Sequence, residues 1–262
     1  MRDPEALRLD VERGESIALD WYAGRGELPP ALFIHGLGSH RRGEKARHFA
    51  HRFNAEGRSL AGIDLRGHGD SDGALRDLTM TRLLADVAAA ADWTTMQSRS
   101  SRLVLIGVSM GAAAAAWHAL NHPAAIEALI LIAPALRFPS ALVDDLDRAP
   151  LAHWRATGLL RLRSEWIDVE LGAQLIEDAA RYDPRELKRR LEVPTLLLHG
   201  QRDMTISWEE SAEFVRGKSH ADLFLVGGGD HRLTAHKELL FDLSSAWLAH
   251  QCGEDPLTSR AR

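Results

Sequence analysis

Hydrophobic and polar positions follow two periods along most of the chain. Short apolar runs alternate with longer segments in which apolar residues recur at helical spacing. The runs predict strands at residues 7–11, 16–22, 31–34, 59–64, 103–108, 128–133, 195–199 and 223–226. The helical pattern covers residues 43–56, 79–97, 110–121 and 235–250. Because helices connect successive strands, most strand pairs are expected to be parallel, while the first two strands are expected to form an antiparallel pair.

One segment interrupts this alternation. Residues 134–192 have a helical pattern, contain no strand-like run and are dense in Arg, Leu and Trp. We therefore predict a small helical lid inserted into a core made of residues 1–133 and 193–252. Residues 253–262 are polar and contain Pro256, which predicts a flexible tail. The expected fold class is α/β, with eight mostly parallel strands flanked by helices.

The composition limits the classes of function. The 262 residues include 32 Lys and Arg against 37 Asp and Glu, and the formal net charge is -5. This near balance offers no basic field to a polyanion, so nucleic-acid binding is disfavoured. The single cysteine, Cys252, excludes an intrachain disulfide and a multi-cysteine metal cluster.

Two stretches bear on the cellular location. The polar N-terminal residues lack the apolar run of about 7 to 15 residues that a secretory signal needs, so a cytoplasmic location is expected. The apolar run 103–120 approaches the roughly 18 to 20 residues of a membrane-spanning helix. Gly107 and Gly111 divide that run into a strand and a helix, and no membrane span is therefore predicted.

The clearest chemical signal is Gly107-Val-Ser-Met-Gly111, which follows a predicted strand and precedes a predicted helix. A sharp strand-to-helix turn forces its central residue into a strained conformation that only small neighbours tolerate. The turn also lifts the hydroxyl of Ser109 out of the sheet, above the positive end of the helix dipole. Ser109 is therefore a candidate nucleophile, and a helix-capping serine is the plainer alternative.

A serine nucleophile needs a base and an orienting acid. Asp203 follows the predicted strand 195–199, at the sheet edge where α/β proteins collect functional groups. His231 follows the last predicted strand in a glycine-rich loop. A helix-capping aspartate and a solvated histidine are the alternatives, and Asp230 is a second candidate for the acid. The chain order Ser, Asp, His favours Asp203 and His231.

Five motifs follow one another along the chain. They are His35-Gly-Leu-Gly38, Asp64-Leu-Arg-Gly-His-Gly-Asp-Ser71, Gly107-Val-Ser-Met-Gly111, His199-Gly-Gln-Arg-Asp203 and Gly229-Asp-His231. Together they resemble the α/β-hydrolase superfamily, in the expected order over residues 16–250, and the later ones are similar to the short-lidded esterase and thioesterase branch.

The resemblance implies an α/β-hydrolase fold with a small lid, and it implies roles for matching residues. Ser109 would be the nucleophile, His231 the general base and acid, and Asp203 the acid that fixes the imidazole. The backbone N–H groups of Leu37 and Met110 would form the oxyanion hole.

Four further residues are candidates for contact with a substrate. His35 and Gly36 belong to the oxyanion loop, where His35 is also expected to brace the loop by hydrogen bonds. Trp154 and Trp166 come from the predicted lid, most of whose apolar residues are expected to form its own core. A wall of Trp and Leu would suit an apolar acyl or aromatic group.

The predicted activity is hydrolysis of carboxylic esters through an acyl-enzyme, without a metal or organic cofactor. The histidines of residues 35–51, and the pair His118 and His122, lack the partners of a metal site. Apart from His35, which is expected to brace its loop, they are assigned to surface or helix-end positions. Acyl thioesters are the nearest alternative substrates, followed by amides and C–C bonds. A perhydrolase with the same three residues and a non-catalytic ligand-binding protein remain open. The sequence leaves the oligomeric state unknown.

Overall fold

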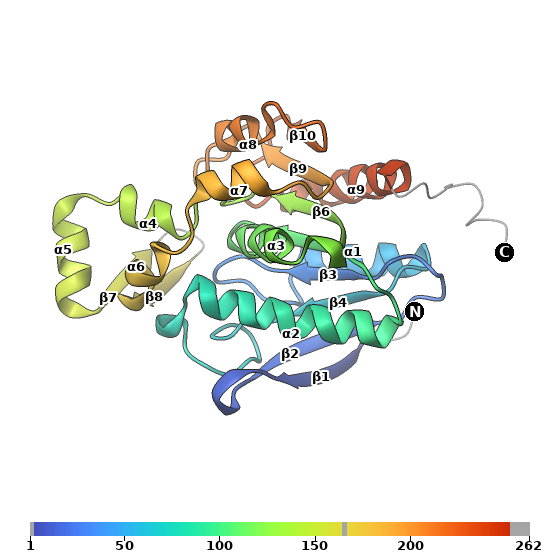
Figure 1. Cartoon of the computed structure of the whole chain (residues 1–262), viewed down its shortest axis with the longest axis horizontal. Helices are drawn as coiled ribbons and strands as arrows, with labels where there is room; N and C mark the ends of the chain where they lie inside the picture. Colours follow the sequence, from blue (N-terminus) through green and yellow to red (C-terminus); the bar gives the residue numbers. More distant parts are fainter. Residues whose placement is uncertain (1–2, 164–166, 252–262) are drawn as a thin grey trace.

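The computed structural model describes residues 3–163 and 167–251, and its centre is an eight-stranded sheet (Figure 1). The strand order is β1-β2-β4-β3-β5-β6-β9-β10. These strands are β1 (Glu5–Asp10), β2 (Ser16–Tyr22), β3 (Ala31–Ile34), β4 (Leu60–Ile63), β5 (Leu103–Val108), β6 (Ile126–Ile132), β9 (Thr195–Gly200) and β10 (Ala221–Val226). β2 pairs antiparallel with β1 and β4, and the other pairs are parallel. The predicted eight-stranded, mostly parallel sheet is confirmed.

Helices cover both faces of this sheet. The helices of the core are α1 (Glu44–Ala55), α2 (Met80–Ser98), α3 (Met110–Asn121), α8 (Trp208–Val215) and α9 (Lys237–Gln251). Side chains of α2, α3 and α8 join one hydrophobic cluster, and those of α1 and α9 join another. In β5, Leu103 and Leu105 belong to the first cluster, whereas Val104 and Ile106 belong to the second. Because successive side chains of a strand point to opposite faces, this strand needs apolar cover on both sides.

Helix α3 lies against the centre of the sheet, where it contacts β5 and β6. Its five consecutive alanines, residues 112–116, have no exposed surface. Side chains that are no larger than a methyl group let the helix backbone approach the strands closely. The alanine run therefore sets the packing of the helix that follows Ser109, in addition to favouring helix formation.

The segment 134–192 lies between β6 and β9, and its described residues contain α4 (Ser140–Asp144), α5 (Arg148–Thr157), α6 (Gln174–Ala179), α7 (Pro184–Arg190) and the antiparallel pair β7 (Leu159–Arg163) and β8 (Asp168–Gly172). The helices α4, α5 and α6 and the pair of strands form a cap at the carboxyl ends of the central strands (Figure 1, left), whereas α7 lies against α3. The prediction that this segment holds no strand was therefore wrong. In β7, Leu160 and Leu162 alternate with Arg161 and Arg163, which is the two-residue period of a strand. Gly158, at φ +79°, ends α5 and permits the chain reversal.

Two expectations concern the margins of the structure. The predicted flexible tail, residues 253–262, lies outside the described residues, as does Trp166. Within residues 3–163 and 167–251, no helix combines the length and the hydropathy that crossing a membrane requires.

His118 lies in the last turn of α3, at a helix end as predicted, and gives the fold a testable pH dependence because its side chain is buried. Burial lowers its pKa from the ordinary value of 6.5 to about 4, and the neighbouring His122 adds to this effect. The unfolded chain therefore takes up a proton at His118 below pH 6.5, whereas the folded protein does so only near pH 4. The stability that this group contributes is complete above pH 6.5 and is lost as the pH falls toward 4, by up to about 1.4 kcal/mol per pH unit.

Urea unfolding at several pH values between 7 and 4 measures this effect. His118→Leu removes this proton uptake. The unfolding free energy of the variant is therefore expected to fall less steeply with pH than that of the wild type, by up to about 1.4 kcal/mol per pH unit. The exposed His153 on α5 offers a control, because His153→Leu makes the same substitution at the surface. Identical slopes for the wild type and His118→Leu would contradict this interpretation.

Candidate active site

Ser109 occupies the sharp turn between β5 and α3, with φ +52° and ψ -115°. Four backbone hydrogen bonds hold this turn. The N–H of Ser109 donates to the carbonyl of Ile132 (2.9 Å), and its own carbonyl accepts from the N–H groups of Ala112 (3.0 Å), Ala113 (3.3 Å) and Ala135 (3.2 Å). A positive φ is strained for any residue other than glycine and persists only where the surroundings over-determine it. The fold thus holds the Ser109 side chain in one direction at the end of the central strand.

The glycines that flank Ser109 are required by close backbone contacts. A Cβ atom on Gly107 would lie 2.5 Å from Cα of Ala112. On Gly111 it would lie 2.4 Å from the carbonyl oxygens of Ile34 and His35, at the end of the adjacent strand β3. Both distances are far below van der Waals contact, so no larger residue fits at either position.

The structure brings Ser109, His231 and Asp203 together from distant parts of the chain. Nε2 of His231 lies 3.1 Å from Oγ of Ser109, and Nδ1 of His231 lies 2.7 Å from Oδ2 of Asp203. The three residues follow β5, β10 and β9, so the carboxyl edge of the parallel strands assembles them. The result is one continuous chain of hydrogen bonds that ends on the serine hydroxyl.

The sequence left two alternatives open, namely Asp203 as a helix cap and Asp230 as the orienting acid. Ser207, not Asp203, caps helix α8, because its hydroxyl accepts from the N–H of Glu209 (3.3 Å). Asp230 accepts from the N–H of Leu233 (2.8 Å) and thereby braces the loop of His231 instead of contacting its ring. In this geometry, Asp203 is the carboxylate that orients the imidazole.

Asp203 is held as a carboxylate although its side chain is fully buried. Burial by itself would raise the pKa of Asp203, but hydrogen bonds from His199, His231 and the N–H of Ile206 hold that pKa well below its usual range. Oδ1 accepts from the N–H groups of Thr205 (2.8 Å) and Ile206 (2.9 Å). Oδ2 accepts from His231 and, at 3.1 Å, from Nε2 of His199. Sequence reasoning missed His199, although this residue opens the motif that contains Asp203.

The loop after β3 lies beside the serine. A Cβ atom on Gly36 would lie 3.2 Å from Cβ of Ser109 and 3.1 Å from the carbonyl oxygen of Val108, so the loop approaches the turn as closely as glycine allows. Among the hydrogen bonds of the described residues, the backbone N–H groups of Leu37 and Met110 donate to no protein acceptor. Met110 is the first residue of α3, where an N–H has no partner within the helix. Two donors therefore remain available next to Ser109.

His35 braces this loop and does not face a substrate. Its side chain is buried, Nδ1 donates to the carbonyl of Gly36 (2.7 Å), and Nε2 accepts from the N–H of Leu65 (3.1 Å). Burial lowers the pKa of His35 from its ordinary value of 6.5 to about 3, and the nearby His68 adds to this effect. Both nitrogens of the neutral ring are engaged, which corrects the expectation that His35 binds the substrate.

Arg41 ties the other end of the same loop to the sheet. Its backbone N–H donates to Oδ1 of Asp64 (2.6 Å), and its buried guanidinium binds the carboxylates of Asp64, Asp20 and Asp70. Asp64 directly follows β4, which pairs with β3. Charge-assisted hydrogen bonds in a buried place are directional, so these contacts fix the path of the loop that carries Leu37.

Trp154 does not line a substrate site in this structure. Its side chain has no exposed surface, and Nε1 donates to the carbonyl of Leu171 in β8 (3.0 Å). Trp154 belongs to the core of the cap, together with Leu160 and Leu171. The expectation that Trp154 contacts the substrate was therefore wrong. The ring is buried among apolar side chains and its N–H already has an acceptor, so Trp154 stabilises the cap.

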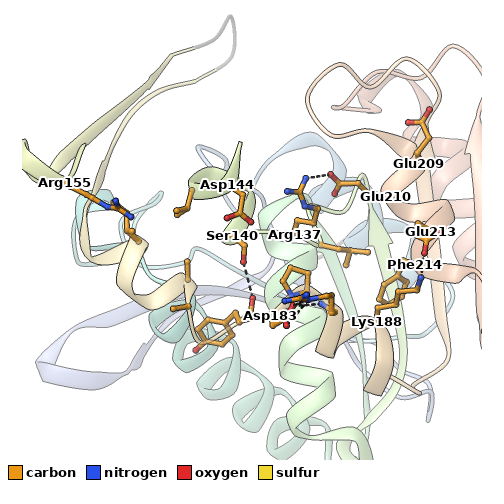
Figure 2. A pocket seen from close by; sticks show the side chains of 18 residues that line it. Arg137, Ser140, Asp144, Arg155, Asp183, Lys188, Glu209, Glu210, Glu213 and Phe214 are labelled. Atoms are coloured by element: carbon orange, nitrogen blue, oxygen red, sulfur yellow. Dashed lines mark hydrogen bonds and ion pairs between the residues drawn. The ribbon is translucent and has the colours of Figure 1, made fainter. Parts of the chain in front are cut away.

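A cleft of about 960 Å³ lies between the cap and helices α7 and α8. Figure 2 shows side chains that line it. Leu136, Ile176 and Phe214 are among the apolar residues that line it, and the three residues of the hydrogen-bond chain are not among them. Arg137 reaches across toward α8, where it pairs with Glu210 (3.4 Å), and it also pairs with Asp145 of the cap (3.0 Å). These ion pairs connect the cap to the helix that follows Asp203.

In the parts of the chain that the structure describes, no three His, Cys, Asp or Glu side chains converge as ligands of one metal ion.

The fold and this arrangement define the class of protein: the chain is an α/β hydrolase of the serine-hydrolase kind. It belongs to the family described as "Serine aminopeptidase, S33", whose model matches residues 31–174.

Known proteins agree with this assignment. The mitochondrial palmitoyl-protein thioesterase ABHD10 of Bos taurus is 24% identical over 217 residues, which are 80% of this chain and 69% of the relative. The AB hydrolase superfamily protein YisY of Bacillus subtilis is 25% identical over 240 residues, which are 79% of this chain and 86% of the relative.

Solved structures share the fold. A putative hydrolase from Agrobacterium vitis S4 has a TM-score of 0.82 at 24% identity and covers 94% of this chain and 98% of its own. Est1E from Butyrivibrio proteoclasticus, with ferulic acid bound, has a TM-score of 0.79 at 22% identity and covers 95% of this chain and 100% of its own. The chain is thus an α/β hydrolase with esterase and thioesterase relatives.

Gly36 offers a test of the loop beside Ser109. Gly36→Ala is expected to lower kcat about 10- to 100-fold with little change in Tm, because the added methyl group pushes Leu37 away from the serine by a few tenths of an ångström. Gly43→Ala is a matched control at the end of the same loop, since its Cβ would lie 3.2 Å from the carbonyl oxygen of His40. Ester hydrolysis and thermal unfolding of both variants measure the effect. An equal loss of activity in both would show that general crowding of the loop, and not the position beside Ser109, is responsible.

Proposed function

We propose that the chain hydrolyses carboxylic esters through an acyl-enzyme on Ser109. The observation that carries this proposal is the continuous hydrogen-bond chain from the Ser109 hydroxyl through His231 to the buried Asp203 carboxylate. The backbone N–H groups of Leu37 and Met110, which donate to no acceptor among the described residues, support it. A carboxylate that remains ionised can stabilise the imidazolium that forms when the serine loses its proton.

The geometry supports a two-step reaction. Nε2 of His231 accepts the proton of Ser109 as Oγ attacks the carbonyl carbon, and the same nitrogen then donates it to the leaving alcohol. The N–H groups of Leu37 and Met110 stabilise the oxyanion, and each such donor typically lowers the barrier by about 2.7 to 4 kcal/mol. A water molecule, activated by His231, then attacks the acyl-enzyme and releases the acid.

Acyl thioesters are the second candidate substrates. The name of the ABHD10 relative, a palmitoyl-protein thioesterase, supports this possibility, and the same groups would serve because only the leaving atom differs. The family description, serine aminopeptidase, makes amides a third. A perhydrolase, a C–C bond hydrolase and a non-catalytic binding protein are further outcomes that substrate tests distinguish.

Rates with p-nitrophenyl esters of increasing acyl length, and with acyl thioesters of the same lengths, test the proposal. The expected result is turnover of the esters that disappears in Ser109→Ala. Faster turnover of thioesters at every length would reassign the substrate class. If a fluorophosphonate labels Ser109 but neither series reacts, ester hydrolysis is excluded, and amides and C–C bonds would be tested next. Absence of labelling would favour a binding protein.

A further inference from the structure

A second histidine contacts the acid of the proposed active site. His199 is the fifth residue of β9, has no exposed surface and lies four residues before Asp203. Its Nε2 is 3.1 Å from Oδ2 of Asp203 and 3.1 Å from the carbonyl oxygen of Ile206. Its Nδ1 is 2.8 Å from the hydroxyl of Ser211, which is also fully buried. The reaction steps above make no use of this histidine.

The contacts determine where His199 carries its proton. Nε2 faces two oxygens that can only accept, Oδ2 of Asp203 and the carbonyl of Ile206, so Nε2 must hold a hydrogen. Nδ1 faces a hydroxyl, which can donate. A neutral ring therefore requires that Ser211 donates to Nδ1, and this bond fixes both the tautomer and the orientation of the ring.

His199 completes the set of donors around Asp203. The two backbone N–H groups of Thr205 and Ile206 bind Oδ1, and the two imidazoles of His199 and His231 bind Oδ2. Four donors match the four acceptor positions of a carboxylate, and the side chain has no contact with solvent. The orientation of Asp203 toward His231 is consequently determined on all sides.

We propose that His199 is a positioning residue, which holds Oδ2 of Asp203 in line with His231. Its N–H hydrogen bond also offsets part of the negative charge on Oδ2. Ser211 supports His199 from α8, which lies beside β9 and β10 (Figure 1). The inference rests on the proposed function, since His199 acts through Asp203 and His231. Without His199, Oδ2 would face His231 alone, so His231 would bind its proton more tightly and be less well aligned.

Three variants separate the hydrogen bond from packing. His199→Phe keeps a planar ring but removes the N–H donor, whereas His199→Gln keeps a donor at about the position of Nε2. Thr195→Val is the matched control, because Thr195 is buried in the same strand and its hydroxyl binds only the carbonyl of Val193 (2.7 Å) among the described contacts.

Two measurements are made on the full chain. The first is the NMR titration of ¹³C-labelled histidine, which follows His231 and needs no turnover. In His199→Phe the titration midpoint of His231 is expected to move upward by about 0.5 to 1 pH unit, and in His199→Gln to stay near the wild-type midpoint. The second is the pH profile of ester hydrolysis, in which His199→Phe is expected to lower kcat about tenfold and to move the acidic limb of kcat/KM in the same direction. Thr195→Val should leave both unchanged.

The outcomes distinguish the two proposals. Unchanged titration and pH profile in His199→Phe, even with a lower Tm, would show a purely structural role and overturn the inference. Equal effects of His199→Phe and His199→Gln would also overturn it, because the N–H donor would then not be the cause. If the wild type fails to turn over any ester but the titration moves as expected, the proposed function fails while the positioning role stands.

Discussion

Ser109→Ala is expected to lower kcat for ester hydrolysis by about 10⁵- to 10⁶-fold. The substitution removes the atom that would form the acyl-enzyme and leaves His231 without its proton donor. The backbone hydrogen bonds of the turn are independent of the hydroxyl, and alanine has the same Cβ as serine, so the strained φ costs both residues the same. The unfolding free energy should therefore change by less than about 1 kcal/mol.

Steady-state rates and urea unfolding of the wild type and Ser109→Ala check this expectation. Ser207→Ala is a suitable control, because it also removes a loop hydroxyl but one that only caps α8. It should retain full activity. A Ser109→Ala variant that keeps even a tenth of the wild-type rate would place the nucleophile elsewhere.

Asp203→Asn is expected to lower kcat about 10⁴-fold. The amide oxygen would remain on the N–H groups of Thr205 and Ile206, which turns the amide NH₂ toward His231 and His199. His231 could then meet the amide only with an unprotonated Nδ1, so Nε2 would carry the hydrogen and could not accept the proton of Ser109. The new NH₂ group would also face the N–H at Nε2 of His199, so two donors would oppose each other and destabilise the site further.

The rate of Asp203→Asn at neutral and alkaline pH measures this effect, with Asp230→Asn as the control. Asp230 contacts a backbone N–H of the same loop, which an asparagine oxygen can still accept, so activity should fall less than about tenfold. If instead Asp230→Asn were the inactive variant, the orienting acid would have to be reassigned.

The central strands and their helices could be read from the sequence almost to the residue. β3, β5 and α3 have the predicted bounds because residues such as Pro30 before β3, Arg102 before β5 and Pro123 after α3 interrupt the apolar runs. The cap could not be read so well. The exposed positions of its β7–β8 hairpin are mostly Arg, Asp and Glu. Each strand therefore has only a few apolar residues, too few to indicate a strand in a segment whose composition favours helices. Short two-stranded pieces depend on packing against the rest of the protein, which a local pattern does not contain.

The candidate site shows the same division. The motif context singled out Ser109, Asp203 and His231, and the turn glycines have clear steric reasons. The role of His199 and the burial of Trp154 could not be foreseen, since each depends on contacts with distant residues. The contact between His199 and Ser211 joins a strand to a later helix, and the helix α8 itself had not been predicted.

The most direct test of the Ser109 mechanism is to trap the acyl-enzyme. The protein is mixed with p-nitrophenyl butyrate, quenched in acid within milliseconds and weighed intact, and the modified peptide is then sequenced by mass spectrometry. The expected result is one butyryl group per chain, located on Ser109 and absent from Ser109→Ala. An unmodified Ser109 during turnover, or a butyryl group on another residue, would contradict the mechanism.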